Sequence, residues 1–194
     1  MNLEFARFIA CELSDVVFEL GGLSNAEFID CAGIGTRLLR DELHNASLRR
    51  CRFKRADFRR SSFWQAVLED CDLSQSAAAE TAFIRTRAER VSFRAAGLLD
   101  TQLEGAIFKN CDFRQADLRE GDAFDTLFED SDLRDAQLNS RSLRGSTFVR
   151  CKFHGMTGKP KIEGEVTLIE PDLSPEGDGT QIVSAEEILR LWRA

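Results

Sequence analysis

The chain has 194 residues, a formal net charge of -7 and a hydrophobic content of 43%. This length fits one domain with a short tail, and the apolar content is sufficient for a continuous core. No apolar run approaches the roughly 18 residues that a membrane helix needs, so we expect no transmembrane segment.

From Leu3 to Phe153 a Leu or Phe recurs at every fifth position. Of these 31 positions, fourteen are Leu and thirteen are Phe, and only Gly33, Ala78, Ala88 and Ala123 depart from the pattern. Neither the 3.6-residue period of a helix nor the two-residue period of a strand keeps such positions on one face. A fixed short repeat predicts a solenoid. Because the repeat begins at once, we expect no signal peptide and a cytoplasmic location.

The neighbouring positions of each repeat are also regular. A small side chain usually stands two residues before the Leu or Phe, and a polar one directly before it, as in Ala56-Asp57-Phe58 and Cys111-Asp112-Phe113. Residues 1 to about 155 therefore resemble the pentapeptide-repeat family, whose consensus is A(D/N)Lxx. The resemblance implies an all-β fold, a right-handed quadrilateral parallel β-helix of about 7–8 coils. Each coil would hold four pentapeptides, with the Leu or Phe and the small residue pointing inward.

Six cysteines occupy the small position, and each follows the one before it by twenty or forty positions: Cys11, Cys31, Cys51, Cys71, Cys111 and Cys151. This spacing independently indicates a coil made of four pentapeptides, with Val91 and Ser131 completing the same column. Thiols in such a column are parallel, whereas a metal site needs ligands that converge. We therefore predict an internal ladder of reduced thiols, with no metal and no cofactor.

Charges on the outward positions follow the same register of one coil. One column alternates in sign: Asp30, Arg50, Asp70, Arg90, Asn110, Asp130 and Arg150. A second column reads Glu12, Ala32, Arg52, Asp72, Ser92, Asp112, Asp132 and Lys152. Opposite charges on adjacent rungs stabilise a sheet, so we interpret both columns as structural ladders.

Two adjacent outward columns carry large apolar side chains, which we call the apolar corner. Trp64, Ile84 and Phe124 share one column, and Val67, Ile107 and Leu127 share the other. Exposed apolar groups that lie together mark contact surfaces, so these six residues are candidates for binding a protein. The alternative is local repacking, in which Phe124 turns inward beside the undersized Ala123.

A basic strip occupies another column, with Lys54, Arg94, Arg114, Arg134 and His154. The segment Arg49 to Arg60 adds seven cations against one acid, Asp57. Such a surface could contact phosphate or an acidic protein. Because Arg50 and Arg52 already have ladder partners, we expect a solvated face or a protein-docking patch rather than direct binding of nucleic acid.

Acidic residues gather towards the C-terminal end of the repeat. Asp117, Glu120, Asp122, Asp125, Asp130 and Asp135 are candidates for an acidic face. The resemblance includes DNA-mimic members that bind type II topoisomerases, in which such a face imitates the DNA backbone. Here the imitation would be partial, because Arg114, Arg119, Arg134, Arg141 and Arg144 interleave with the acids.

Residues 156–194 form a tail with a different composition. Gly155, Gly158 and Pro160 predict the end of the coils, Glu165–Glu170 a short strand and Pro171–Gly179 a loop. Ser184 and Glu187 then form the capping-box pattern of a helix at about 185–193. Ile188, Leu189 and Trp192 share one face of this helix, which we expect to cap the last coil. The resemblance also implies a homodimer through this end, for which these three residues are the candidates.

No combination of residues indicates catalysis. His44 and His154 lie far apart in the sequence and in different columns, and phosphate-binding loops are absent from the sequence. We therefore predict a non-enzymatic protein-interaction solenoid with no small-molecule substrate. The resemblance makes DNA gyrase or another type II topoisomerase the leading named partner, in quinolone or toxin protection. The alternative is a scaffold or adaptor that docks other proteins through the apolar corner and the tail.

Overall fold

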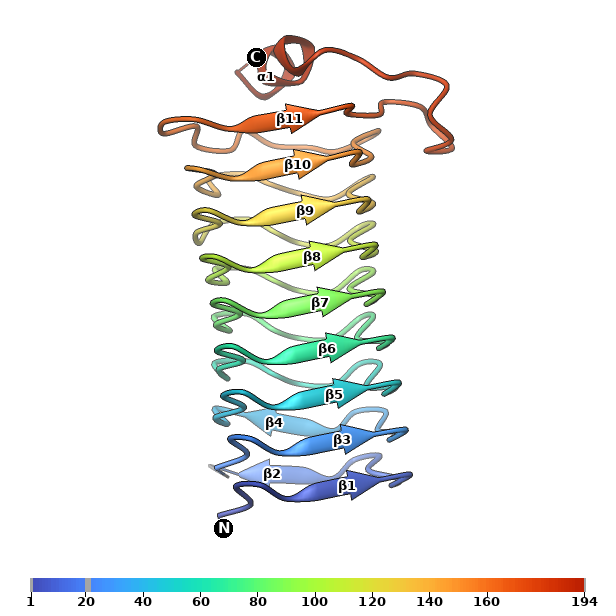
Figure 1. Cartoon of the computed structure of the whole chain (residues 1–194), viewed down its shortest axis with the longest axis vertical. Coiled ribbons are helices and arrows are strands. Elements are labelled where there is room, and N and C mark those ends of the chain that lie inside the picture. Colours follow the sequence, from blue (N-terminus) through green and yellow to red (C-terminus); the bar gives the residue numbers. More distant parts are fainter. Residues whose placement is uncertain (1, 20–21, 194) are drawn as a thin grey trace.

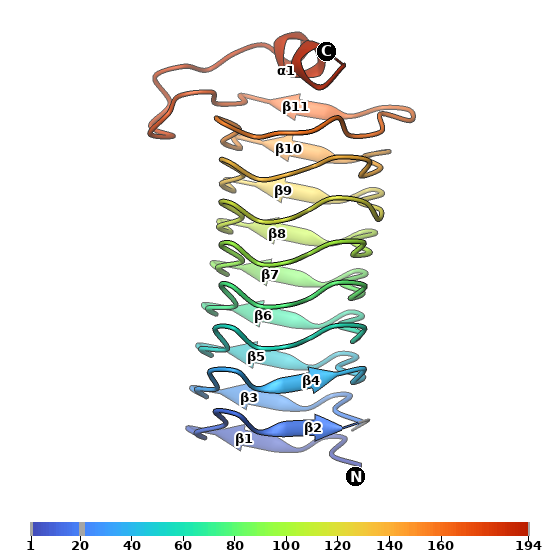
Figure 2. The same ribbon diagram turned by 180° about the vertical axis from the view of Figure 1, so that it is seen from behind.

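The computed structural model describes residues 2–19 and 22–193, and shows a parallel β-solenoid closed at its C-terminal end by one helix (Figures 1 and 2). The strands of the main sheet lie next to one another in this order: β1 (Arg7–Ile9), β3 (Glu27–Ile29), β5 (Ser47–Arg49), β6 (Val67–Glu69), β7 (Arg87–Glu89), β8 (Ile107–Lys109), β9 (Leu127–Glu129), β10 (Thr147–Val149) and β11 (Thr167–Ile169). On another side, β2 (Val17–Glu19) pairs with β4 (Arg37–Leu39), and α1 spans Ala185–Arg193. The predicted quadrilateral parallel β-helix with one C-terminal helix is confirmed.

Backbone bridges join residues that lie twenty positions apart on all four sides of the coil, and Ser142 with Lys161, nineteen apart, is an exception. The Cα partners in the main sheet include Arg7 with Glu27. Single parallel bridges, such as Glu12 with Ala32 and Arg37 with Asp57, join the other sides. The coil length inferred from the cysteines is therefore the structural repeat. Each outward column of the sequence becomes a vertical line of side chains on the surface.

At the corners that the structure describes between residues 5 and 155, a left-handed residue stands two positions after the core position. Asp30, Asp70 and Asp130 have φ angles of 55°, 54° and 50°. The turn closes with a hydrogen bond such as Ala56 N–H to the Phe53 carbonyl, at 3.2 Å. Asn, Asp and Gly tolerate this conformation best, which explains why acids are frequent at these positions.

The core is a stack of Leu and Phe side chains. Phe108 and Phe128 stack with ring centroids 5.2 Å apart, and Phe128 stacks on Phe148 at 4.9 Å. At Gly33 the core residue is missing because a neighbour fills the space. A Cβ atom there would clash with the Thr36 hydroxyl and lie 2.8 Å from the Phe53 ring.

The small inward position has a hydrogen-bonding role as well as a steric one. Its hydroxyl or thiol donates to the carbonyl of a core residue in the preceding coil, as in Thr81 Oγ1 to Phe58 O at 2.8 Å. The thiol of Cys51 bonds Phe28 O in the same way, at 3.3 Å. All six cysteines are free, and all but Cys11 are buried, so the predicted thiol ladder is confirmed. Within the described ranges, no cluster of His, Cys, Asp or Glu is placed to hold a metal.

Arg141 occupies a small inward position, although the sequence analysis counted it among the surface cations. Its side chain is buried, 1% exposed, and points into the coil. Its guanidinium donates to Thr101 Oγ1 at 2.9 Å, to Thr101 O at 3.0 Å and to Leu98 O at 3.2 Å. Burial lowers the pKa of Arg141 to about 10, and the carbonyl groups take the place of a counter-ion.

The backbone continues beyond the end of the sequence repeat. β11 pairs with β10 in register, with Thr167 opposite Thr147, and Asp172 bridges Lys152. The expectation that Gly155, Gly158 and Pro160 end the coils is therefore wrong for the backbone. Main-chain hydrogen bonds such as Ser140 N–H to Lys159 O, at 3.0 Å, need no repeat of side chains.

The helix α1 covers the last coil (Figure 1). Ser184 Oγ accepts the Glu187 N–H at 3.2 Å, as the predicted N-cap requires. Ile188 and Trp192 are buried against the core. In the part of the chain that the structure describes, no helix is long and apolar enough to cross a membrane.

Candidate protein-docking surfaces

Trp64 is the most exposed aromatic residue of the apolar corner, and neighbouring side chains fix its position. The residue is 37% exposed, and its ring lies edge-on to the His44 ring with centroids 5.9 Å apart. His44 Nε2 is in turn 3.0 Å from Ser62 Oγ. The indole therefore presents a rigid apolar surface to solvent.

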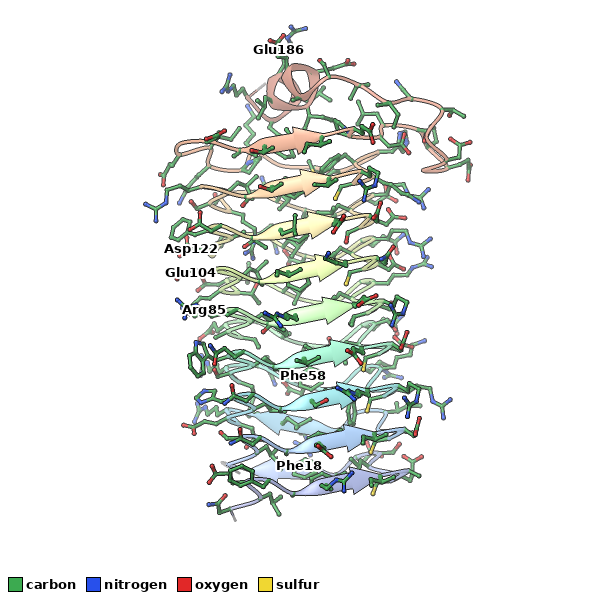
Figure 3. The ribbon with its side chains drawn as sticks, in the orientation of Figure 1. Phe18, Phe58, Arg85, Glu104, Asp122 and Glu186 are labelled. Atoms are coloured by element: carbon green, nitrogen blue, oxygen red, sulfur yellow. The ribbon has the colours of Figure 1, made fainter. Side chains whose placement is uncertain are left out.

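Charged residues interrupt both columns of the apolar corner. Arg87 on β7 lies between Val67 on β6 and Ile107 on β8. In the other column, Glu104 separates Ile84 from Phe124. Figure 3 shows Glu104 between Arg85 and Asp122 along this edge of the coils. The structure thus brings the predicted apolar residues into neighbouring columns but not into one continuous patch.

A shallow groove runs beside this corner, and the sequence analysis did not find it. The groove has a volume of about 550 Å³ and is lined by Asn45, Gln65, Val67, Arg85, Arg87, Gly105 and Ile107. A second hollow of about 510 Å³ lies on the adjoining sheet face, with Leu68 and Ala88 at its floor. The undersized core residue Ala88, between the outward residues Arg87 and Glu89, was the signal that could have located this second hollow.

Arg85 and Arg87 give this groove its positive charge. Neither makes an ion pair with any residue that the structure describes. The groove therefore combines apolar side chains with two guanidinium groups that are available to a ligand.

Phe124 and Leu127 lie towards the C-terminal end of the corner. Phe124 is half-buried, with the Arg144 guanidinium carbon 4.3 Å from its ring centre. The ring thus lies beneath a surface arginine and does not replace the missing core side chain at Ala123. Leu127 on β9 is also half-buried.

The candidate acidic residues are distributed around the coil. Glu120, Asp125, Asp130 and Asp135 stand at four successive corners, one pentapeptide apart. The structure does not bring these four together on one side of the solenoid. Asp122 lies on a flat side of the coil, where a parallel backbone bridge pairs it with Ser142.

Two of these acids also form ion pairs. Arg119 donates to both Asp117 oxygens at 2.8 Å, and Arg150 donates to Asp130 at 2.6 and 2.7 Å. These hydrogen bonds hold the pKa values of Asp117 and Asp130 below their usual range. Their charges are largely neutralised locally.

The first charge ladder forms as predicted, with Arg50 on Asp30, Arg90 on Asp70 and Arg150 on Asp130. The prediction that the second column forms ion pairs between adjacent coils is wrong. Its acids bond instead within their own corner, where Asp112 binds Arg114 and Asp132 binds Arg134. An aspartate that precedes a core residue accepts both the backbone N–H and the guanidinium of the residue that follows the core residue.

The basic segment Arg49 to Arg60 is mostly paired. Its ion pairs are Arg49–Glu69, Arg50–Asp30, Arg59–Asp57 and Arg60–Glu80. Among the described residues, Arg52, Lys54 and Arg55 have no ion-pair partner. These three lie at the same corner as Arg94.

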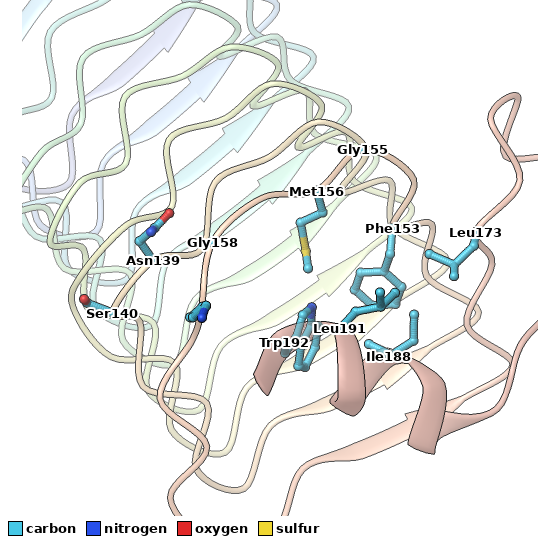
Figure 4. A pocket seen from close by; sticks show the side chains of 11 residues that line it. Asn139, Ser140, Phe153, Gly155, Met156, Gly158, Leu173, Ile188, Leu191 and Trp192 are labelled. Carbon is cyan, nitrogen blue, oxygen red and sulfur yellow. The ribbon is translucent and has the colours of Figure 1, made fainter. Parts of the chain in front are cut away.

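The C-terminal candidates face the core. Ile188 and Trp192 are buried, Leu189 is partly buried, and Leu191 is 56% exposed. A hollow of about 530 Å³ lies between α1 and the last coil, with Phe153 and Met156 at its wall (Figure 4). The three predicted residues therefore form the cap, and Leu191 is the apolar side chain that α1 presents to solvent.

The fold and its inward Leu and Phe define a repeat protein, and comparison with known proteins supports the same class. The family model described as a pentapeptide repeat region matches residues 46–122. The predicted resemblance to the pentapeptide-repeat family is thus confirmed over these residues. No curated protein matches the chain by sequence.

Two solved structures share the fold. HetL, a pentapeptide repeat protein involved in heterocyst differentiation regulation from the cyanobacterium Nostoc sp. strain PCC 7120, aligns at 15% identity with a TM-score of 0.52. This alignment covers 90% of the chain and 85% of HetL. A trypsin-treated variant of QnrB1, a plasmid-mediated fluoroquinolone resistance protein, aligns at 16% identity with a TM-score of 0.54, covering 87% and 92%. At these identities the likeness extends to the fold.

Proposed function

We propose that this protein is a non-enzymatic, protein-binding solenoid that docks a partner at the apolar corner. The observation that carries the proposal is the exposed, fixed indole of Trp64 beside a groove whose two arginines make no ion pair with a described residue. Trp and Arg are the residues most enriched among those that dominate binding energy at interfaces. The matching partner segment carries apolar side chains together with a carboxylate.

The rigidity of the solenoid supports this role. Main-chain hydrogen bonds join adjacent coils around the groove, as in Asn45 N–H to Trp64 O at 2.9 Å and Gln65 N–H to Ile84 O at 3.0 Å. A surface that is already ordered loses little conformational entropy on binding. The Trp64 corner is thus preorganised for docking.

Affinity capture with the whole protein tests the proposal. We expect partners that bind the wild type to be lost with Trp64→Glu and with Arg87→Glu. Ile34→Glu is the matched control, because Ile34 is also an exposed apolar residue but lies at another corner. Partners that persist with both groove variants would refute the apolar-corner proposal, provided that circular dichroism shows each variant folded.

A type II topoisomerase, DNA gyrase in particular, is the second candidate partner. The similarity to QnrB1, over 87% of this chain, favours it. The spread of the acids over four corners argues against a DNA-mimic face. Purified protein would be titrated into a gyrase supercoiling assay with and without a fluoroquinolone. Unchanged supercoiling and cleavage complexes at micromolar protein would remove this candidate.

We further propose a homodimer through the C-terminal end and a cytoplasmic location. Because Ile188 and Trp192 are buried in the cap, Leu191 would make the dimer contact. Light scattering should then show half the mass for Leu191→Glu, and an unchanged mass would exclude that contact. Six free cysteines suit a reducing compartment, which fractionation of cells would test.

A further inference from the structure

The segment after β11 lies against the basic strip. In Figures 1 and 2 the chain between β11 and α1 projects beyond one edge of the coils before it returns to the cap. Arg134 Nη1 donates to Pro175 O at 2.8 Å, and His154 Nδ1 is 3.1 Å from Leu173 O. The backbone of Gly177 packs against the side chains of Arg134 and Lys152.

This segment is acidic, and its fold is fixed from within. Asp172 accepts hydrogen bonds from Ser174 Oγ at 2.8 Å and from Gly179 N–H at 3.0 Å. The pKa of Arg134 is raised mainly by its hydrogen bonds to Asp132, and Glu176 adds to the effect. The basic strip therefore already binds one acidic stretch of chain, which turns at Pro175 and offers its main-chain carbonyls.

The binding group recurs one coil earlier, where no described segment occupies it. Asp132 holds Arg134 through Nε and Nη2, at 2.9 and 2.7 Å, which leaves Nη1 for the Pro175 carbonyl. Asp112 holds Arg114 through the same two atoms at the same distances. No described residue accepts from Nη1 of Arg114. The Arg114 side chain is 36% exposed and that of Arg134 only 15%.

Further cations that form no ion pair with the described residues extend this surface towards the N-terminus. Arg94 lies one rung before Arg114, and Lys54 lies two rungs before Arg94, with Arg52 and Arg55 beside it. At a rung spacing of about 4.8 Å, Lys54 and Arg114 are roughly 14 Å apart. An extended peptide covers that distance with about four or five residues.

We propose that the unoccupied part of this corner, from Arg114 to Lys54, binds an acidic segment of a partner protein. Nη1 of Arg114 takes a main-chain carbonyl, as Nη1 of Arg134 does in the chain's own segment. Arg94, Lys54 and Arg55 face the partner's carboxylates. This surface is separate from the apolar corner, so the solenoid offers two docking sites of different chemistry.

Fluorescence anisotropy with a labelled ten-residue peptide tests the inference. The peptide copies residues 170–179, which contain four acids, and its control replaces them with Gln and Asn. We expect the acidic peptide to bind the whole protein and to weaken with added salt, whereas the neutral peptide does not bind. Equal binding of the two peptides would overturn the proposal.

Charge reversal locates the site. Arg94→Glu combined with Arg114→Glu should weaken binding by about tenfold or more. The control, Arg40→Glu with Arg190→Glu, changes net charge equally at two exposed positions outside both proposed docking sites and should leave the affinity within about twofold. An unchanged affinity in the first variant, or a loss in the control, would contradict the assignment.

Two further measurements guard against misfolding and against a different ligand. Lys54→Gln with Arg94→Gln leaves the Asp112–Arg114 pair intact and should still weaken binding several-fold, with an unchanged melting temperature. A short DNA duplex is the competitor. If the duplex binds more tightly than the peptide and responds to the same variants, the corner is a nucleic-acid site and the proposal fails.

Discussion

The indole of Trp192 lies edge-on to the ring of Phe153, with centroids 5.8 Å apart and planes at 80°. It makes a second edge contact with Phe148, at 5.9 Å. Edge-to-face packing is a favoured geometry for aromatic pairs. The indole is therefore the last ring of the aromatic stack, and α1 closes the solenoid core with it.

Replacing Trp192 should therefore destabilise the whole molecule. We expect Trp192→Ala to lower the free energy of unfolding by about 3–5 kcal/mol, as for other large-to-small changes in a core. Urea denaturation followed by circular dichroism measures the change. Glu186→Gln, at an exposed position of α1, should stay within about 0.5 kcal/mol of the wild type. Equal effects of the two changes would contradict the capping role.

Restoring the repeat at Gly33 should be harmful. Gly33→Leu matches the sequence pattern, but Phe53 and Thr36 already fill that space, so we expect a loss of about 1–3 kcal/mol. Thermal melting measures it. Gly97→Ala is the control, since the nearest atom to its new Cβ, Ser76 O, would lie 3.9 Å away. A melting temperature for Gly33→Leu at or above the wild-type value would be inconsistent with the packing described.

The buried Arg141 should be needed more for its volume than for its charge. Arg141→Ala leaves a cavity, and we expect a loss of about 3 kcal/mol in urea denaturation. Arg141→Met keeps most of the volume and avoids burying a charge, so its loss should be less than half as large. Should the Met variant be as unstable as the Ala variant, the hydrogen bonds to Thr101 and Leu98 are the dominant contribution.

Acid should weaken the aspartate–arginine pairs of the corners. The hydrogen bond from Arg119 lowers the pKa of Asp117, so the folded state takes up this proton at a lower pH than the unfolded chain does. The stabilisation is complete above the unfolded pKa of about 3.9 and is lost as the pH falls through the folded pKa. Asp117→Asn should cost about 0.5–1 kcal/mol at pH 7 and progressively less below pH 4.

Melting temperatures at pH 7, 5, 3 and 2 measure this dependence. Arg119→Gln is the matched variant, since it removes the same pair from the other side. Both variants should approach the wild type as the pH falls towards 2. A gap that stays constant down to pH 2 would show that the pair contributes nothing to the acid response.

The thiol ladder predicts a simple reactivity pattern. Burial raises the pKa values of Cys111 and Cys151 to about 12, and the thiolate is the reactive form. We expect a thiol reagent at pH 8 to modify about one cysteine in the native protein, Cys11, and all six after denaturation. Rapid modification of several thiols in the folded state would contradict the ladder.

Sequence periodicity was sufficient to predict which side chains point inward. The period of five sets the direction of each side chain, and the spacing of one coil sets its vertical neighbours, so Cys51 and the Arg50–Asp30 pair could be placed before the structure was known. Both patterns follow from backbone geometry alone. That is why they are visible in a single sequence.

Choices between near-equivalent partners were not predictable. Asp112 lies near arginines on its own and adjacent rungs, and it bonds Arg114 because that residue also offers its backbone N–H. Arg141 was misplaced, since its burial depends on carbonyl groups of other coils that accept its hydrogen bonds. The contact of Arg134 with Pro175 joins distant parts of the chain through an irregular loop, for which no repeat exists.

The register of one coil also sets the unit by which such a chain can change length. Removal of one whole coil, for example residues 62–81, would leave each remaining column continuous and simply shorten the stack. Removal of a single pentapeptide would rotate everything after it by a quarter turn, so Arg90 would no longer stand above Asp70. Insertions and deletions within the coils of relatives should therefore come as whole coils, four pentapeptides at a time.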